Sequence, residues 1–188
     1  HAYSEQLAVR FAEAGFHAVA IDYFDRTQGV SERADGFDWQ SEIGTLTDEG
    51  VASDVAAAVA HLDTVHAGPT FTLGFCFGGS HSWRLSAGDL GLSGVMGFYG
   101  RPAMIADVED SMRTPLLLLV AGADAATPVE EFEALDARLS ADDVPHEMHV
   151  YAGAPHSFFD RGFAEWRDAC ADAWTRILDF TAANSVDA

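Results

Sequence analysis

The feature of this sequence that most limits its fold is the regular alternation of helix-like and strand-like segments along the chain. Apolar spacing predicts helices at residues 3–14, 51–65, 80–87, 128–140 and 163–183, with a short helix or turn at 103–111. Runs of β-branched and aromatic residues predict strands at 17–24, 69–76, 92–99, 115–121 and 146–151, and residues 25–48 are expected to form a long loop. Such alternation is typical of an α/β fold with a mostly parallel sheet covered by helices on both faces.

Composition predicts one domain and excludes several classes of partner. The 188 residues are 48% hydrophobic, enough for one core, and no linker or repeat divides residues 1–188. Thirty acidic residues against ten basic ones give a net charge of −20, so nucleic acid is not an expected partner. The longest apolar run is too short to span a membrane, and no signal peptide is visible. The two cysteines lie 94 positions apart without metal or disulfide spacing, which favours a reducing cytoplasm.

Chemically useful side chains follow three of the predicted strands. Cys76 lies in the segment Gly-Phe-Cys-Phe-Gly-Gly, Asp124 follows Gly-Ala, and His156 follows Gly-Ala-Pro. In an open parallel sheet, functional residues gather beyond the carboxyl ends of the strands. We therefore expect these three residues to meet at one edge of the sheet.

The pattern around Cys76 is that of a nucleophile elbow with cysteine in place of serine. Glycines two before and two after the nucleophile allow the tight strand-to-helix turn, and the helix N-terminus favours a thiolate. The backbone N–H of Phe77 is then expected to point toward a developing oxyanion. His156 is predicted to serve as proton donor and as the base that activates water, with Asp124 orienting its imidazole.

The other candidates are predicted to be structural. His81 falls in the helix after the elbow, and His146 and His149 face opposite sides of a strand, which is poor geometry for one metal. Cys170 is expected to pack in the last helix. The acidic cluster Asp107, Glu109 and Asp110 is expected to be a solvated surface, so no metal site is predicted.

Several motifs together make the chain resemble the dienelactone hydrolases, also called carboxymethylenebutenolidases. The motifs are AVAIDYF at 18–24, GFCFGG at 74–79, GFYG at 97–100, AGAD with a proline four residues later at 121–128, and GAPHSF at 153–158. The resemblance covers nearly the whole chain. It implies a three-layer α/β-hydrolase fold and a triad of Cys76, Asp124 and His156 that opens a small ester or enol-lactone through a thioester, without a cofactor. In this family the product is maleylacetate.

The family also suggests where a substrate carboxylate binds. Family members hold it with arginines, one of them four residues after the catalytic histidine; here that position is Asp160, and Arg161 follows it. Arg26 and Arg101, each just after a predicted strand, are the other candidates. The oligomeric state and the natural substrate are left open by the sequence.

Comparison with the α/β-hydrolase fold leads to two further expectations. In the α/β-hydrolase fold, a strand that precedes the first helix lies in the sheet between the two strands predicted here at 17–24 and 69–76. The loop after that strand supplies the second oxyanion donor and a glutamate of the family. This strand is not found in the sequence, so we expect an N-terminally incomplete chain. The alternatives to a dienelactone hydrolase are a broad carboxylesterase or thioesterase with the same triad, and a noncatalytic binding or redox-sensing module that keeps the cysteine elbow.

Overall fold

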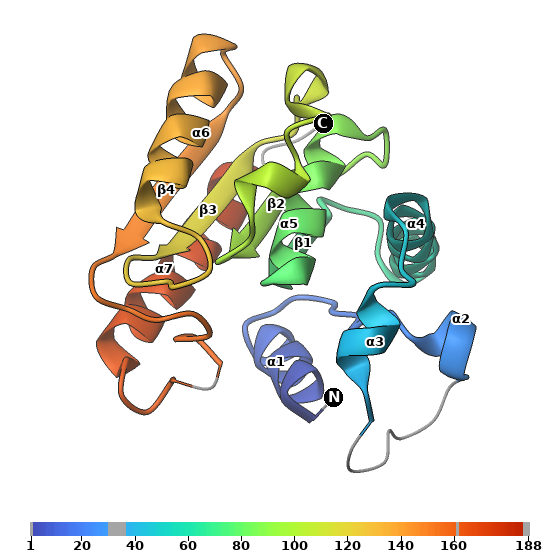
Figure 1. Cartoon of the computed structure of the whole chain (residues 1–188). Coiled ribbons are helices and arrows are strands. Elements are labelled where there is room, and N and C mark those ends of the chain that lie inside the picture. The colour runs from blue at the N-terminus through green and yellow to red at the C-terminus, as the bar shows by residue number, and fades with distance from the viewer. Residues whose placement is uncertain (1, 30–36, 161, 186–188) are drawn as a thin grey trace. The chain divides into compact units, whose positions relative to one another are not determined.

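The computed structural model describes residues 2–29, 37–160 and 162–185, and the chain divides into two compact units, His1–Gly68 and Pro69–Ala188 (Figure 1). The first unit contains four helices within its described residues: α1 Ala2–Glu13, α2 Asp25–Gln28, α3 Trp39–Ile43 and α4 Asp48–Val65. The side chain of Thr47 caps α4 by accepting a hydrogen bond from the Gly50 N–H, 3.0 Å away. The predicted helices at 3–14 and 51–65 are therefore confirmed, the second beginning three residues earlier.

The strand predicted at 17–24 is wrong. Residues 16–22 have no regular secondary structure, and residues 23 and 24 form a turn before α2. A strand needs backbone hydrogen bonds to a neighbouring strand, and the described part of the first unit contains no strand. Residues 17–20 and 22 are also exposed, with Val19 at 43%, whereas Ile21, Tyr23 and Phe24 are half-buried. The loop predicted at 25–48 is interrupted by α2 and α3, and its residues 30–36 lie outside the described residues.

The second unit is built on a four-stranded parallel sheet. Its strands are β1 Phe71–Phe75, β2 Gly94–Phe98, β3 Leu116–Ala121 and β4 His146–Tyr151, hydrogen-bonded in the order β1-β2-β3-β4. All four coincide with predicted strands, and β4 has the predicted limits. Their carboxyl ends lie at one edge of the sheet because all four strands run in the same direction.

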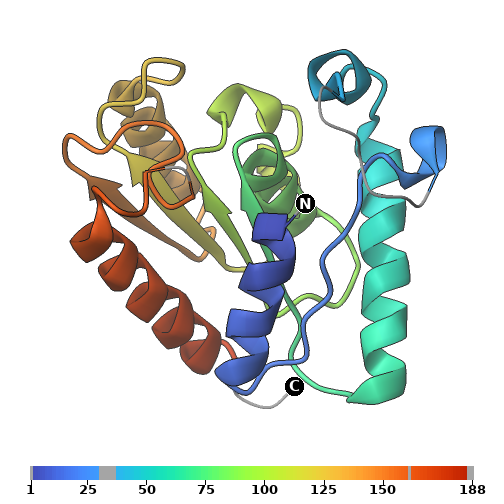
Figure 2. The ribbon, with the colours of Figure 1, turned by 90° about the horizontal axis from the view of Figure 1, so that it is seen from below.

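Helices cover both faces of this sheet. They are α5 Phe77–Arg84, extended by a 3₁₀ turn at Leu85–Ala87, α6 Val129–Ala141 and α7 Arg167–Ala183; two more 3₁₀ turns span Pro102–Met104 and Glu109–Ser111. Figure 2 shows α7 on one face and α5 and α6 on the other. The second unit is thus a three-layer α/β structure, as predicted. The last helix begins at Arg167, four residues later than expected.

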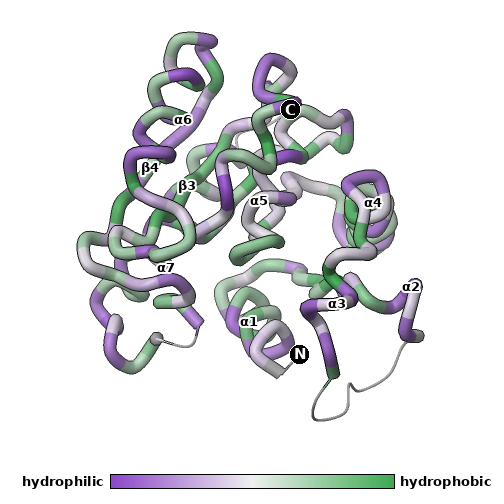
Figure 3. The backbone as a smooth tube through the Cα atoms, viewed as in Figure 1, coloured by the Kyte–Doolittle hydropathy of each residue, from purple (hydrophilic) through white to green (hydrophobic). Residues whose placement is uncertain are grey.

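The core of the second unit centres on β2 and β3. Every residue of both strands is buried, and β3 is apolar throughout, as the green colour in Figure 3 shows. Trp83 of α5 is also fully buried, and its indole N–H donates a hydrogen bond to the Leu117 carbonyl, 3.1 Å away. A strand buried on both faces reads as a continuous apolar run, which explains why β3 was easy to locate in the sequence.

Candidate active site

Cys76 lies at the turn between β1 and α5, where it is the N-cap residue of the helix. Its φ of 53° and ψ of −116° are unfavourable for a residue with a side chain, as is typical of a strained nucleophile position. Its backbone N–H donates a hydrogen bond to the Phe98 carbonyl of β2. The predicted strand, turn and helix around the cysteine are therefore present.

Gly74 makes this turn possible. A Cβ atom at Gly74 would lie 1.9 Å from the backbone oxygen of Gly78, a distance that no side chain tolerates. The chain thus returns over its own strand so closely that only glycine fits. The first turn of α5 therefore lies directly against the end of β1.

Asp124 and His156 follow β3 and β4, and backbone hydrogen bonds join the two loops that carry them. The Gly122 N–H donates to the Tyr151 carbonyl over 2.9 Å, and the Ala123 N–H donates to the Ala154 carbonyl over 2.8 Å. Neighbouring strands in the sheet thus place the aspartate next to the histidine, as expected from their positions at the ends of parallel strands.

The side chains of Asp124, His156 and Cys76 form a chain of hydrogen bonds. His156 Nδ1 lies 2.6 Å from Asp124 Oδ2, and the Ala126 N–H donates to Asp124 Oδ1 over 2.8 Å. The Asp124 side chain is 1% exposed, whereas that of His156 is 32% exposed. The imidazole also hydrogen-bonds Cys76. Because Nδ1 bonds Asp124, the other ring nitrogen, Nε2, is the one available to the sulfur of Cys76.

These contacts shift the pKa values of the cysteine and the histidine in opposite directions. The hydrogen bond with His156 is the largest influence that lowers the pKa of Cys76; the charge of His156, the Phe77 N–H and the charge of Arg101 also lower it, while burial acts in the opposite direction. The Cys76 hydrogen bond, with help from Asp124, raises the pKa of His156 to about 9 against the effect of burial. The arrangement favours a thiolate beside an imidazolium.

Two residues that the sequence analysis missed lie against this chain of hydrogen bonds. Tyr99, which follows β2, is buried with a φ of 36°, and its ring centroid lies 4.8 Å from that of His156. Ser80 of α5 is also fully buried, and its hydroxyl contacts both the Cys76 carbonyl and the Arg101 N–H. Ser80 has no recognisable signal in the sequence, and the GFYG motif contains Tyr99 without indicating its contact with His156, because both contacts join segments that only folding brings together.

The three arginines predicted to bind substrate have different surroundings. Arg101 follows β2 and is exposed; within the described residues its guanidinium makes no ion pair or hydrogen bond, and its charge lowers the pKa of Cys76. Arg26 of α2 is paired with Asp54 of α4, its Nε 2.8 Å from the carboxylate, and also hydrogen-bonds Ser53. Arg161 lies outside the described residues.

The remaining polar candidates have structural partners. His146 contacts Asp136 of α6 while His149 contacts Arg176 of α7, so the two histidines do face opposite sides of β4. His81 is buried in α5 with its ring 4.2 Å from that of Phe77. The sulfur of Cys170 is buried in α7 and donates to the Phe158 carbonyl.

The acidic cluster is only partly the solvated surface that was expected. Asp107 forms two hydrogen bonds with Arg84, and Glu109, which is buried, forms two with Arg138. Asp110 is exposed. Within the described ranges, no group of three or more histidine, cysteine, aspartate or glutamate residues could hold a metal ion.

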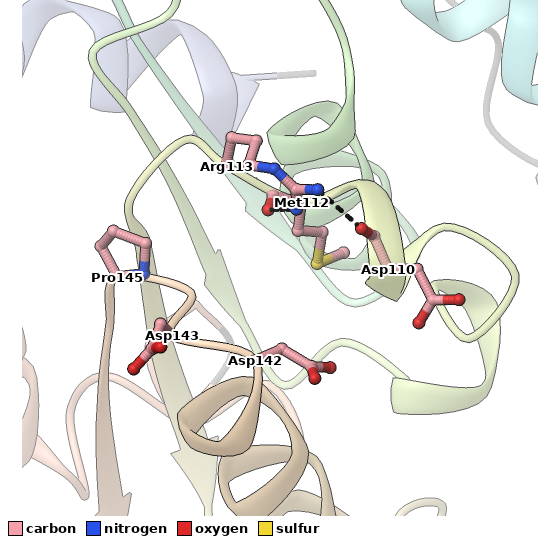
Figure 4. Close-up of a pocket in the computed structure, with 6 residues that line it drawn as sticks. All are labelled: Asp110, Met112, Arg113, Asp142, Asp143 and Pro145. Carbon is pink, nitrogen blue, oxygen red and sulfur yellow. Dashed lines mark hydrogen bonds between the residues drawn. The ribbon is translucent and has the colours of Figure 1, made fainter.

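The cavity drawn in Figure 4 lies away from Cys76, Asp124 and His156. It has a volume of about 570 Å³ and is lined by the residues that precede β3 and β4: Asp110, Met112, Arg113, Asp142, Asp143 and Pro145. It therefore lies at the amino ends of those strands, opposite the edge that carries Asp124 and His156. No helix in the described part of the chain is long and apolar enough to cross a membrane.

A parallel sheet between two helix layers, with a cysteine at a strand-to-helix turn, is the arrangement found in α/β-hydrolases. The chain belongs to the dienelactone hydrolase family, because the sequence profile of that family matches residues 2–185. It is therefore a hydrolase by family.

Relatives and solved structures agree with this assignment. A Yersinia pestis protein assigned as a carboxymethylenebutenolidase is 26% identical over the full chain, which spans 75% of that protein. A Bradyrhizobium protein assigned as a 2-oxo-3-(5-oxofuran-2-ylidene)propanoate lactonase is 28% identical over 94% of the chain and 76% of its own length. A Klebsiella pneumoniae crystal structure, assigned as a dienelactone hydrolase, superposes with a TM-score of 0.82 at 25% identity, covering 97% of this chain and 81% of that one.

Proposed function

We propose that this protein hydrolyses a small carboxylic ester or enol-lactone by using Cys76 as nucleophile, His156 as general acid and base, and Asp124 to orient the histidine. The observation that carries the proposal is the continuous hydrogen-bond chain from Asp124 through His156 to Cys76, with a lowered pKa at the sulfur and a raised pKa at the imidazole. Neighbouring groups whose pKa values are strongly shifted by each other, at the ends of strands, indicate a functional site.

The reaction begins when the Cys76 thiolate adds to the ester carbonyl carbon. A C–S bond forms and the carbonyl electron pair moves to oxygen, and we assign the Phe77 N–H, which is among the groups that lower the pKa of Cys76, to stabilise the charge on that oxygen. The C–O bond to the leaving group then breaks, and the imidazolium of His156 supplies a proton to the departing oxygen. The product of this half-reaction is a thioester on Cys76.

Water completes the cycle. Neutral His156 accepts a proton from water as the water oxygen attacks the thioester carbonyl, and collapse of this second intermediate breaks the C–S bond and releases a carboxylic acid. Asp124 keeps Nδ1 protonated throughout, so that the nitrogen near the sulfur exchanges protons. No step requires a metal or an organic cofactor.

The preferred substrates are inferred from the relatives and from one arginine. Relatives are assigned as carboxymethylenebutenolidases and as a lactonase, which supports a lactone for this chain. Arg101 is exposed, and its charge acts on Cys76; we assign it to a carboxylate on the substrate. A thiol nucleophile works only while reduced, which favours a reducing compartment such as the cytoplasm.

The test compares Cys76→Ala with Cys170→Ala on a dienelactone and on a short aryl ester. Cys76→Ala is expected to abolish turnover of both, whereas Cys170→Ala, which removes the buried cysteine, is expected to retain it. Turnover by Cys76→Ala at the wild-type rate would rule out the mechanism. Efficient hydrolysis of the aryl ester but not of the lactone would favour a broader carboxylesterase.

The lowered pKa of Cys76 also favours one alternative, a redox-sensing thiol, because oxidation requires a thiolate. Alkylation of Cys76 near neutral pH without hydrolysis of any ester by the wild-type protein would support that role. Thioester formation, detected by mass spectrometry as an acyl adduct on Cys76, would support the hydrolase instead.

A further inference from the structure

We propose that Ser80 is a positioning residue for this site: through its hydroxyl it polarises and orients the peptide unit whose N–H belongs to Phe77. The inference rests on the proposed function, since it assigns that N–H to the oxyanion. Ser80 is fully buried in the first turn of α5 and four residues after the nucleophile.

The contacts of Ser80 form a relay across two elements. The backbone N–H of Arg101, just after β2, donates to Ser80 Oγ over 2.8 Å. The Ser80 hydroxyl in turn donates to the Cys76 carbonyl over 3.3 Å, and the Ser80 N–H donates to the same oxygen over 3.1 Å. The Cys76 carbonyl therefore accepts two hydrogen bonds from one residue.

That carbonyl belongs to the same peptide unit as the Phe77 N–H, because a peptide unit joins the C=O of one residue to the N–H of the next. Hydrogen bonds in a chain polarise one another, with strengthening of roughly 10–30% per bond. Electron density drawn toward the Cys76 oxygen makes the Phe77 N–H a stronger donor. This N–H already lowers the pKa of the Cys76 thiol by bonding its sulfur.

An ordinary helical serine also bonds the carbonyl four residues earlier, so the back-bond alone would not carry the inference. Two features set Ser80 apart: its oxygen also accepts the Arg101 N–H, and the carbonyl it bonds belongs to the nucleophile. Ser86 provides the matched comparison. It is equally buried and its hydroxyl donates to the Thr114 carbonyl over 2.6 Å, but it lies in the 3₁₀ turn after α5.

The experiment measures two quantities in wild type, Ser80→Ala, Ser80→Thr and Ser86→Ala. The first is the pKa of Cys76, from the pH dependence of its alkylation by iodoacetamide, and the second is kcat/KM for the lactone or aryl ester. Ser80→Ala is expected to raise the thiol pKa and to lower kcat/KM about tenfold through kcat, less than the roughly 10²–10³-fold that loss of an oxyanion donor costs. Ser80→Thr keeps the hydroxyl and should restore both values, and Ser86→Ala should change neither.

The outcomes separate the two proposals. An unchanged thiol pKa and unchanged kcat in folded Ser80→Ala, with an active wild type, would overturn the role of Ser80 and leave the proposed hydrolase intact. If Ser80→Ala raises the thiol pKa but the wild-type protein hydrolyses no ester, the result would support the role of Ser80 and contradict the proposed hydrolase activity. If Ser80→Ala does not fold, Ser80→Thr and Ser80→Val make the same comparison, because they have the same shape and differ by the hydroxyl.

Discussion

The protonation of His156 depends more on Cys76 than on any other neighbour. The cysteine hydrogen bond is the largest cause that raises the pKa of His156 to about 9, and Asp124 contributes less. Cys76→Ala is therefore expected to lower the pKa of His156 toward the ordinary value of about 6.5. An NMR titration of the imidazole protons checks this. A midpoint that stays near 9 in the variant would show that Asp124 alone sets the shift.

The same pair makes stability depend on pH in both directions. The folded pKa of His156 is raised, so its contribution is complete below its unfolded value of about 6.5 and is lost as pH rises through about 9. The folded pKa of Cys76 is lowered, so its contribution is complete above about 8.5, its unfolded value, and is lost as pH falls through the lowered pKa. Both shifts describe one ion pair and are counted once.

We expect the free energy of unfolding of wild type, relative to Cys76→Ala, to have a broad maximum between about pH 6.5 and 8.5. Urea unfolding of both proteins across this range measures the difference. A difference that increases steadily up to pH 10 would contradict a thiolate and imidazolium pair.

Asp124 is nearly inaccessible, so its effect on activity is expected to be large. Asp124→Asn keeps the shape but no longer holds Nδ1 as the protonated nitrogen, and kcat is expected to fall by about 10⁴-fold, as in the Ser-His-Asp triad. Asp172→Asn is a suitable control, because that carboxylate bonds Tyr151 and Arg176 between β4 and α7. Equal losses in the two variants would indicate a general effect of removing a carboxylate.

At the scale of elements, the crossing of β1 and α5 tolerates no added atom. Gly74→Ala would place a Cβ 1.9 Å from the Gly78 oxygen, which belongs to the backbone and cannot rotate away. We expect a loss of about 3 kcal/mol in the free energy of unfolding, together with loss of activity. At Gly44, a Cβ would meet only an ordinary contact of 3.5 Å, so Gly44→Ala should change stability by less than about 1 kcal/mol. Chemical denaturation of both variants checks the comparison.

The elements also explain how far the sequence could predict this structure. Strands β2 and β3 were found because their apolar runs are buried in the sheet, and Cys76, Asp124 and His156 follow β1, β3 and β4. The segment 17–24 is also rich in apolar and aromatic residues, but it pairs with no strand among the described residues. Composition indicates a preference for strand structure, whereas a strand forms only where a neighbouring strand pairs with it. Ser80 and Tyr99 could not be assigned, since their roles depend on contacts across the fold.

At the scale of the whole molecule, we propose that the two compact units belong to one domain. The described residues of His1–Gly68 include two buried side chains, Val51 and Val55, too few for a separate core. A fragment of residues 1–68 is therefore expected to lack a cooperative thermal transition in circular dichroism, and the full chain to show a single one. Cooperative melting of the fragment would show that it is a domain in its own right.

The left-handed turn at Cys76 separates the position of the reacting atom from its chemical identity. The strain lies in φ and ψ, which are the same for cysteine and for serine, and the Oγ of a serine is smaller than the Sγ of the cysteine. An oxygen could therefore replace the sulfur without rebuilding the turn. The balance of charge with His156 would have to change. Exchange of one nucleophile for another in such a scaffold is therefore limited by the proton affinity of the reacting atom and not by the space around it.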